Sequence, residues 1–355
     1  MSGQRDRLWR EAAARTIPIE VMIELTHHCN LRCGHCYIPD FGSPDRLSAA
    51  RLLALLDELA AMGTLVVALS GGEPLLRPDW LEIARRARAL DFDLHLFTNG
   101  TRVDTAAAAA LAGLDATVHV SFYTLDAAVF DAFVRRQGTF SRVVAGIGHL
   151  RSAGVRTLLK VPLMTFNYRE ARAITAWGEA RGCEVRISPT ITARKDGDPA
   201  PLALRVPQAE LARELGGSVL GCFDRERRLD PEAPLCAAAT RYACITAAGE
   251  VMACSILPGA DGDVRERPFR EVWEGSHWLR RVRSLRRRDL NGCAGCARYD
   301  YCGRCPAQAL VEDGDLAGPA REACARAEIV ERAAGAGERV GIEDGELVPA
   351  AGALA

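Results

Sequence analysis

Strand-like and helix-like segments alternate along the first two-thirds of the chain, and this alternation constrains the fold more than any other feature. Six short apolar or β-branched runs are predicted strands: Ile19–Thr26, Leu65–Ser70, Leu94–Thr98, Thr117–Phe122, Thr157–Leu163 and Glu184–Ser188. Amphipathic patterns between them predict helices at Ser48–Met62, Pro78–Leu90, Thr105–Leu114, Asp126–Arg136, Ser141–Ala153 and Tyr168–Arg181. Apolar strands joined by helices form parallel sheets covered by helices. We therefore predict an α/β fold, a partial (βα)6 TIM-like barrel.

Three cysteines follow the first predicted strand. Cys29, Cys33 and Cys36 have the spacing C-x3-C-x2-C on one loop. Three thiolates at this spacing can hold three irons of a [4Fe–4S] cube and leave the fourth iron open to a substrate. A zinc knuckle with a distant fourth ligand is the alternative. His27 and His28 precede the run, and because three cysteines suffice, we expect structural or supporting roles for both.

A glycine-rich turn follows the second predicted strand. It reads Ser70-Gly71-Gly72-Glu73-Pro74. The glycines let the backbone approach a ligand closely, and the carboxylate of Glu73 suits a cationic amine. The motif alone indicates only a turn, but it lies at the carboxyl end of a strand, where ligands bind in such folds. Thr98-Asn99-Gly100 ends the third strand, and we expect a turn there with a supporting role.

The cysteine run followed by Gly-Gly-Glu-Pro resembles the signature of the radical S-adenosylmethionine (SAM) enzymes, with His35 at the usually aromatic position. The resemblance implies that Cys29, Cys33 and Cys36 are catalytic cluster ligands. It implies that Gly71, Gly72, Glu73 and Pro74 bind the amino group of SAM. By position alone, Ser121 and Asn167 would contact its ribose and carboxylate, and ordinary hydrogen bonding at a loop end stays open for both. Tyr37 would pack near the adenine or against the barrel.

Eight further cysteines lie in the C-terminal third. They are Cys236, Cys244, Cys254, Cys293, Cys296, Cys302, Cys305 and Cys324. Their order resembles the SPASM extension of radical SAM peptide-modifying enzymes, which binds two auxiliary [4Fe–4S] clusters. Two closed cubes need eight thiolates, the number present. The chain departs from the family in having two residues, Gly303 and Arg304, instead of three between the last two cysteines of the second block.

The family's interleaved pattern implies a division of these ligands. Cys236, Cys254 and Cys305 would hold the barrel-proximal cluster, and the distal cluster would be held by Cys293, Cys296, Cys302 and Cys324. Cys244 is either the fourth proximal ligand or a buried cysteine of a hairpin predicted at 245–254, with its turn near Ala248-Gly249. A zinc site of Cys293, Cys296, Cys302 and Cys305 is the alternative, although it leaves the other cysteines unexplained.

These segments predict four parts. Residues 1–18 form a helical N-terminal segment, 19–230 the barrel, 231–330 a small cysteine-rich α+β auxiliary-cluster domain, and 331–355 a flexible tail. Thirteen cysteines clustered at short spacings, without a signal peptide or an apolar span, indicate metal binding in the cytoplasm. A net charge of −1 gives no electrostatic case for nucleic acid or membrane partners. The basic run Trp278–Asp289 is either a solvated helix face or a site for an acidic peptide.

The resemblance implies an enzyme that reductively cleaves SAM to a 5′-deoxyadenosyl radical and abstracts hydrogen from a peptide or protein. The outcome would be a crosslink, a thioether, an epimer or formylglycine. The expected partners are the substrate and a low-potential donor of the flavodoxin or ferredoxin type. The short N-terminal segment leaves no space for a separate leader-recognition domain, so a precursor would either dock on the barrel or SPASM surface or be delivered by a partner protein. One alternative is modification of a tetrapyrrole or another small metabolite. The other is a non-catalytic iron–sulfur electron carrier or zinc-binding module.

Overall fold

The computed structural model describes residues 2–215, 232 and 234–335, and its centre is one eight-stranded sheet with the order β6-β5-β4-β3-β2-β1-β7-β8. The first six strands are β1 (Glu20–Thr26), β2 (Val66–Gly71), β3 (Asp93–Thr98), β4 (Thr117–Ser121), β5 (Arg156–Pro162) and β6 (Glu184–Ser188). All neighbours among them are parallel. The six predicted strands and the partial α/β barrel are confirmed.

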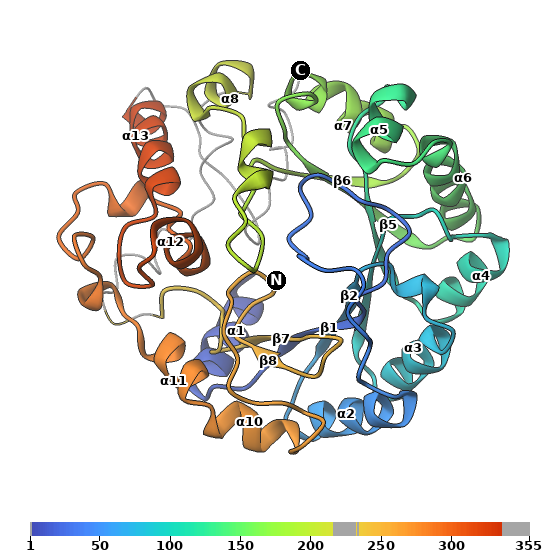
Figure 1. The fold of residues 1–355 in the computed structure, drawn as a ribbon, viewed down its shortest axis with the longest axis horizontal. Helices are drawn as coiled ribbons and strands as arrows, with labels where there is room; N and C mark the ends of the chain where they lie inside the picture. Colours follow the sequence, from blue (N-terminus) through green and yellow to red (C-terminus); the bar gives the residue numbers. More distant parts are fainter. Residues whose placement is uncertain (1, 216–231, 233, 336–355) are drawn as a thin grey trace.

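Helices connect these strands and cover the outside of the sheet (Figure 1). They are α2 (Ala49–Ala61), α3 (Trp80–Ala89), α4 (Thr105–Gly113), α5 (Ala127–Val134), α6 (Thr139–Ser152) and α7 (Ala171–Glu179), with short 3-10 turns η1 (Pro74–Leu76) and η2 (Tyr168–Glu170). Ser48 caps α2 by accepting from the backbone N–H of Arg51 at 3.2 Å. Gly63, at φ 86°, follows its end. Both helix boundary predictions are confirmed.

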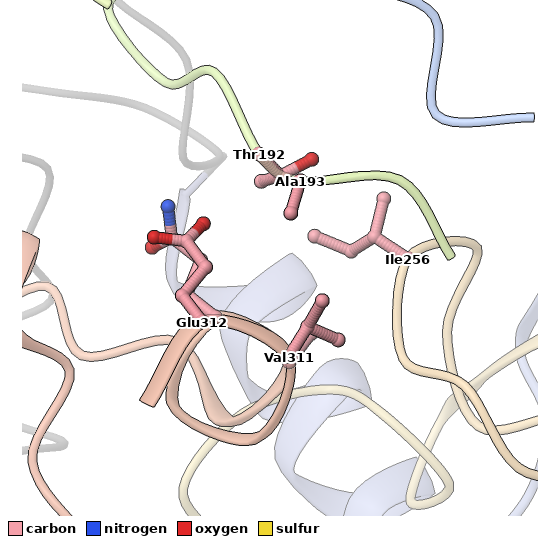
Figure 2. A pocket seen from close by; sticks show the side chains of 7 residues that line it. Thr192, Ala193, Ile256, Val311 and Glu312 are labelled. Carbon is pink, nitrogen blue, oxygen red and sulfur yellow. The ribbon is translucent and has the colours of Figure 1, made fainter. Parts of the chain in front are cut away.

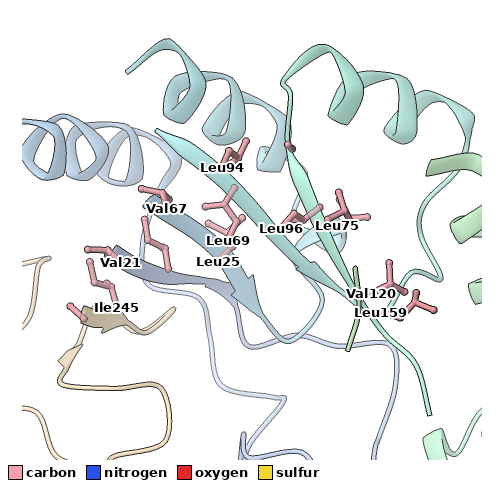
Figure 3. Close-up of a cluster of buried hydrophobic side chains, with 14 of the residues drawn as sticks. Val21, Leu25, Val67, Leu69, Leu75, Leu94, Leu96, Val120, Leu159 and Ile245 are labelled. Atoms are coloured by element: carbon pink, nitrogen blue, oxygen red, sulfur yellow. The ribbon is translucent and has the colours of Figure 1, made fainter. Parts of the chain in front are cut away.

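The two faces of the curved sheet differ in polarity because side chains alternate along each strand. Val67, Leu69, Leu94 and Leu96 point toward the helices and are at most 1% exposed (Figure 3). Burial of each such side chain contributes about 1.5–3 kcal/mol. The intervening positions, including Glu24, His119 and Lys160, carry polar groups on the inner face. The inner face of the barrel thus carries polar and ionisable side chains near the strand ends.

The predicted cysteine-containing hairpin is formed, with β7 (Tyr242–Ile245) antiparallel to β8 (Val251–Met252) and Gly249 at φ 98° in its turn. The structure adds that β7 pairs in parallel with β1, placing Cys244 opposite Met22. A strand with an unpaired edge is an aggregation hazard, and this pairing covers the edge of β1. The auxiliary region and the barrel therefore share one sheet.

The remaining described elements flank this sheet. They are α1 (Ser2–Ala14), η3 (Ala200–Leu204), α8 (Gln208–Leu215), α10 (Phe269–Gly275), α11 (His277–Ser284), η5 (Arg287–Asp289), η6 (Tyr299–Tyr301), α12 (Pro306–Asp313) and α13 (Arg321–Gly335). Figure 2 shows Val311 and Glu312 of α12 facing Thr192, Ala193 and Ile256. The Arg205 side chain pairs with Glu312 at 2.9 Å, which joins the auxiliary region to the barrel.

Two sequence predictions concern the ends of the described chain. The helix α13 continues to Gly335, so the first residues of the predicted flexible tail are helical. The helix extends this far because apolar residues at helical spacing, Ala323, Ala327 and Val330, pack inward along it. The rest of that tail, and Cys222, lie outside the described residues. None of the described helices combines the length and the apolar composition that a membrane crossing requires.

Candidate active site

The Gly-Gly-Glu-Pro turn packs directly against the start of the cysteine loop. The backbone N–H of Gly72 donates to the carbonyl oxygen of Thr26 at 2.7 Å, and that of Glu73 donates to His28 at 2.8 Å. A Cβ atom on Gly71 would lie 2.4 Å from the Thr26 oxygen, and one on Gly72 would lie 2.2 Å from the His28 oxygen. Only glycine fits at this distance, so these residues fix where the loop carrying Cys29 begins.

The Glu73 carboxylate joins the carboxyl ends of two strands. It is fully buried and accepts from the Thr98 hydroxyl at 2.7 Å, the Asn99 backbone N–H at 2.8 Å and the Leu75 backbone N–H at 3.2 Å. Burial raises the pKa of this carboxyl to about 7, and the three hydrogen bonds oppose the rise. The structure thus gives Glu73 an internal structural role, and its contact with the amino group of SAM stays a prediction.

Asn99 supports the cysteine loop more directly than a turn residue would. Its side-chain amide donates to the Asn30 side chain at 2.9 Å and to the Cys29 sulfur at 3.8 Å, and its oxygen accepts from Thr101. The sequence offered only a turn with a supporting role at this position. Asn99 follows β3, and β2 separates β3 from β1, which leads into the cysteine loop, so adjacency in the strand order did not indicate this contact.

The thiols of Cys29, Cys33 and Cys36 form one group. Burial raises the pKa of Cys33 to about 12 and that of Cys36 to about 11, and the charges of neighbouring cysteines in the group add to both. The Tyr123 hydroxyl donates to the Cys33 sulfur at 3.6 Å, a contact that the sequence did not indicate. These buried groups are neutral thiols near pH 7 and become thiolates on binding a metal, and a [4Fe–4S] cluster with three protein ligands fits this donor set.

His35 packs as an aromatic residue. Its ring lies edge-on to Tyr123 at 5.2 Å and stacks on Phe133 at 5.4 Å. Burial lowers the pKa of His35 to about 4, which keeps the ring neutral near pH 7. Histidine therefore fills the usually aromatic position by the same kind of packing.

Asn167 and Ser121 both make contacts within the protein. The Asn167 amide donates to the carbonyl oxygens of Tyr123 at 2.6 Å and Pro162 at 3.0 Å, and its oxygen accepts from the Met164 backbone N–H at 2.7 Å. The Ser121 side chain hydrogen-bonds the Tyr123 hydroxyl. These are the loop-end hydrogen bonds that the sequence left open, and their contacts with SAM stay predictions.

The auxiliary region contributes a second set of cysteines: Cys244 lies on β7 beside β1, and Cys305 lies near Cys236 and Cys254. Burial raises the pKa of Cys305 to about 12, and the charges of Cys254 and Cys236 add to this rise. Backbone N–H groups of Ala307 and Gln308, at the start of α12, donate to the Cys305 sulfur and oppose it. Burial raises the pKa of Cys244, which is fully buried in β7, and the charge of Cys254 adds to the rise. The donor set fits a closed cubane.

A second group of cysteines lies around α13. The pKa of Cys324 is raised by burial and then by the charges of Cys293 and Cys296. The Cys302 sulfur lies 3.9 Å from the carbonyl oxygen of Ala323, the residue before Cys324. Across the residues that the structure describes, no three His, Cys, Asp or Glu side chains converge on the position of a single metal ion. A cubane distributes its thiolates over separate irons.

A cavity of about 470 Å³ opens between the segment after the cysteine loop and the β7–β8 hairpin. Its lining includes Glu24 from β1, Ile38 after the loop, Lys195 after β6, and Thr246 and Met252 from the hairpin. This volume is typical of small-molecule or side-chain binding sites. The cavity lies between the elements that carry the first thiol group and those that carry the proximal auxiliary group.

Comparison with known proteins supports this interpretation over most of the chain. The model for the radical SAM superfamily matches residues 23–177, and that for the SPASM iron–sulfur cluster-binding domain matches residues 236–306. The mycofactocin maturase MftC of Mycolicibacterium smegmatis is 30% identical over 326 residues, which cover 85% of this chain and 81% of that protein. The chain belongs to the radical SAM superfamily.

Two further similarities place this radical SAM enzyme among its relatives. The AdoMet-dependent heme synthase of Methanosarcina barkeri is 28% identical over 335 residues, covering 85% of this chain and 95% of that protein. The crystal structure of Streptococcus suis SuiB bound to S-adenosylmethionine has the same fold, with a TM-score of 0.70, 17% identity and coverage of 89% of this chain and 80% of that one. The predicted family and fold, and an enzyme using SAM, a [4Fe–4S] cluster and auxiliary iron–sulfur clusters, are confirmed.

Proposed function

We propose that this radical SAM enzyme matures a peptide or protein substrate, in the manner of a RiPP-modifying enzyme (one acting on ribosomally synthesised, post-translationally modified peptides). The observation that carries the proposal is the cavity of about 470 Å³ lined by Glu24 of β1, by Ile38 after the cysteine loop and by Thr246 and Met252 of the hairpin. Similarity to MftC and to the PqqA peptide cyclase of Xanthomonas campestris, 27% identical over 338 residues, supports a peptide substrate.

Each part of the site has a distinct task in this proposal. Cys29, Cys33 and Cys36 would hold the cluster that binds SAM, and Gly71, Gly72, Glu73 and Pro74 would form the wall that receives its amino group. When bound, the cluster and SAM supply a 5′-deoxyadenosyl radical that abstracts a hydrogen atom. Glu73 keeps the strand ends aligned, and Asn99 and Tyr123 hold two of the three sulfurs in place. The chain's own contribution is therefore positioning.

The two auxiliary thiol groups would hold one closed cluster each. We assign Cys236, Cys244, Cys254 and Cys305 to the barrel-proximal cluster, and the distal cluster to Cys293, Cys296, Cys302 and Cys324. Burial of Cys244 beside Cys254 supports its role as the fourth proximal ligand. These clusters would accept the electron released when the substrate is oxidised.

The expected partners follow from this chemistry. A low-potential flavodoxin or ferredoxin would supply electrons, and a separate protein would deliver the precursor. We place the enzyme in the cytoplasm, where thiols stay reduced. Co-purification of a small peptide or of its carrier under anaerobic conditions would support this set of partners.

The test is anaerobic turnover of SAM to 5′-deoxyadenosine with dithionite. We expect product from the reconstituted wild type and none from the Cys29/Cys33/Cys36→Ala protein. No product from a fully iron-loaded wild type, with or without candidate peptides, would contradict the proposal.

Modification of a tetrapyrrole is the second candidate function, and similarity to the heme synthase over 95% of that protein's length favours it. Incubation of the reconstituted enzyme with SAM and an iron tetrapyrrole separates the two candidates. A tetrapyrrole mass change, with no change in any peptide encoded beside the gene, would replace the peptide proposal by this one.

A further inference from the structure

A buried ion pair forms part of the lining of the cavity. The Lys195 ammonium donates to Glu24 Oε1 at 2.8 Å, and the Tyr37 hydroxyl donates to the same oxygen at 3.2 Å. The Glu24 side chain is 1% exposed and that of Lys195 is 12% exposed. The backbone N–H of Lys195 donates to the carbonyl oxygen of Tyr37 at 3.1 Å, and its ammonium lies 5.0 Å from the Tyr37 ring centre. The pair is therefore held in one geometry.

Stability alone does not account for these charges. The cost of removing two charges from water offsets most of their attraction, and an apolar pair of similar size stabilises a core about as well. Both Glu24 and Lys195 line the cavity. The charges therefore point to a function in or beside that cavity.

The pair lies next to the proximal auxiliary thiols. Glu24 is on the same face of β1 as Met22, and Met22 is opposite Cys244 in β7. Because paired residues of neighbouring strands project from the same face of a sheet, Glu24 and Cys244 lie on one face of the adjacent strands β1 and β7. The ion pair is therefore next to a thiol assigned to the proximal cluster.

We propose that Glu24 and Lys195 tune the reduction potential of the auxiliary cluster assigned to Cys236, Cys244, Cys254 and Cys305, so that it accepts an electron from a substrate in the cavity. This inference rests on the proposed function. A neighbouring cation stabilises the more negative, reduced form of a cluster, and a neighbouring anion destabilises it. When bound, this cluster would take one electron from the substrate radical, and the proton released in the same oxidation would pass to solvent water.

The experiment is a redox titration followed by electron paramagnetic resonance. It uses full-length protein carrying Cys29/Cys33/Cys36→Ala, so that only the auxiliary clusters contribute. Lys195→Met removes the cation. We expect the midpoint reduction potential of one auxiliary cluster to fall by about 59 mV, which is a tenfold change in the equilibrium constant for one electron. Glu24→Gln removes the anion and is expected to raise the same midpoint, while Lys195→Arg retains the wild-type value.

Opposite shifts separate an electrostatic role from a structural one, because a packing defect has no reason to change sign with the charge removed. Arg270→Met is the matched control, since it removes a cation that is 55% exposed on α10 and is expected to leave both midpoints unchanged. Unmoved midpoints in both variants, or shifts in the same direction, would overturn the inference. If the Lys195→Met protein binds no auxiliary cluster, the midpoint potential of the Glu24→Gln protein decides the test by itself. Failure of the parent triple variant to assemble auxiliary clusters would instead overturn the proposed function and the inference with it.

Discussion

The first cysteine loop and the auxiliary cysteine groups show two ways of assembling thiols. Cys29, Cys33 and Cys36 lie within eight consecutive positions, and one turn of the neighbouring strand sets where their loop begins. The proximal auxiliary group instead draws on a hairpin strand, the segments flanking it and the start of α12. A local motif fixes the first site, whereas the sheet topology fixes the second. Damage to one is therefore expected to leave the other intact.

Gly72→Ala is expected to give the largest and most selective effect. Its Cβ would lie 2.2 Å from the His28 backbone oxygen and displace the start of the cysteine loop. We expect formation of 5′-deoxyadenosine to be lost, and the iron content to fall by roughly one-third, because one of three cubes is lost. Product assay and iron analysis of the reconstituted protein test this. Gly113→Ala, where no atom lies within 4 Å of the new Cβ, is the control. If the auxiliary sites lost as much iron as the first cysteine site, the two kinds of site would not assemble independently.

Cys244→Ala tests the second kind of site. We expect the spectrum of one auxiliary cluster to change while the SAM-binding cluster stays loaded, because Cys244 lies on β7 and not on the first loop. The measurement is electron paramagnetic resonance of the reduced protein with and without SAM. Cys183→Ala removes another buried cysteine and serves as the control. An auxiliary spectrum identical to that of the wild type would show that Cys244 is a packing residue.

This difference also explains what the sequence revealed. The six barrel strands were predictable because each is a short apolar run between amphipathic helices. The first thiol group was predictable because its three cysteines lie within eight consecutive positions. The pairing of β7 with β1 was not predictable, because the two strands are more than 200 residues apart in the sequence and no local pattern encodes their register. The same holds for Glu24 and Lys195, separated by 171 residues, and for the contacts of Asn99 and Tyr123 with the thiols.

The basic run of the C-terminal region gives a further example. The sequence indicated a solvated face or a site for an acidic peptide. In the structure Arg283 donates to the carbonyl oxygens of Ala239 at 2.7 Å and Trp273 at 3.0 Å, and Arg287 lies 4.1 Å from the Tyr299 ring centre. Some arginine side chains of this run therefore hold segments of the auxiliary region together, a role that the pattern of charges in the sequence does not reveal.

Asn99→Ala is expected to have an intermediate effect on the first site. It removes the amide that contacts the Cys29 sulfur and the Asn30 side chain, and loss of such supporting contacts lowers metal affinity or activity by about 10–100-fold. The rate of 5′-deoxyadenosine formation measures it. Asn291→Ala removes an exposed contact with Asp315 in the auxiliary region and is expected to leave this rate unchanged. A rate for Asn99→Ala equal to that of the control would reduce Asn99 to the turn residue that the sequence indicated.

The smallest expected difference between the two regions is in their response to acid. His119 lies inside the barrel, 6% exposed, with its ring stacked on Phe97 at 4.2 Å. Burial, followed by the charge of Lys160, lowers the pKa of His119 to about 2. Because the unfolded chain takes up this proton near pH 6.5 and the folded barrel does not, stability is retained above that pH and falls by up to about 1.4 kcal/mol per pH unit below it.

Urea denaturation at pH 7.0 and pH 5.5 measures the loss. His119→Phe, which keeps the stack on Phe97, should reduce it, whereas substitution of the exposed His277 by Gln in α11 should not. Equal acid sensitivity of the wild type and His119→Phe would show that the histidine inside the barrel is not the source.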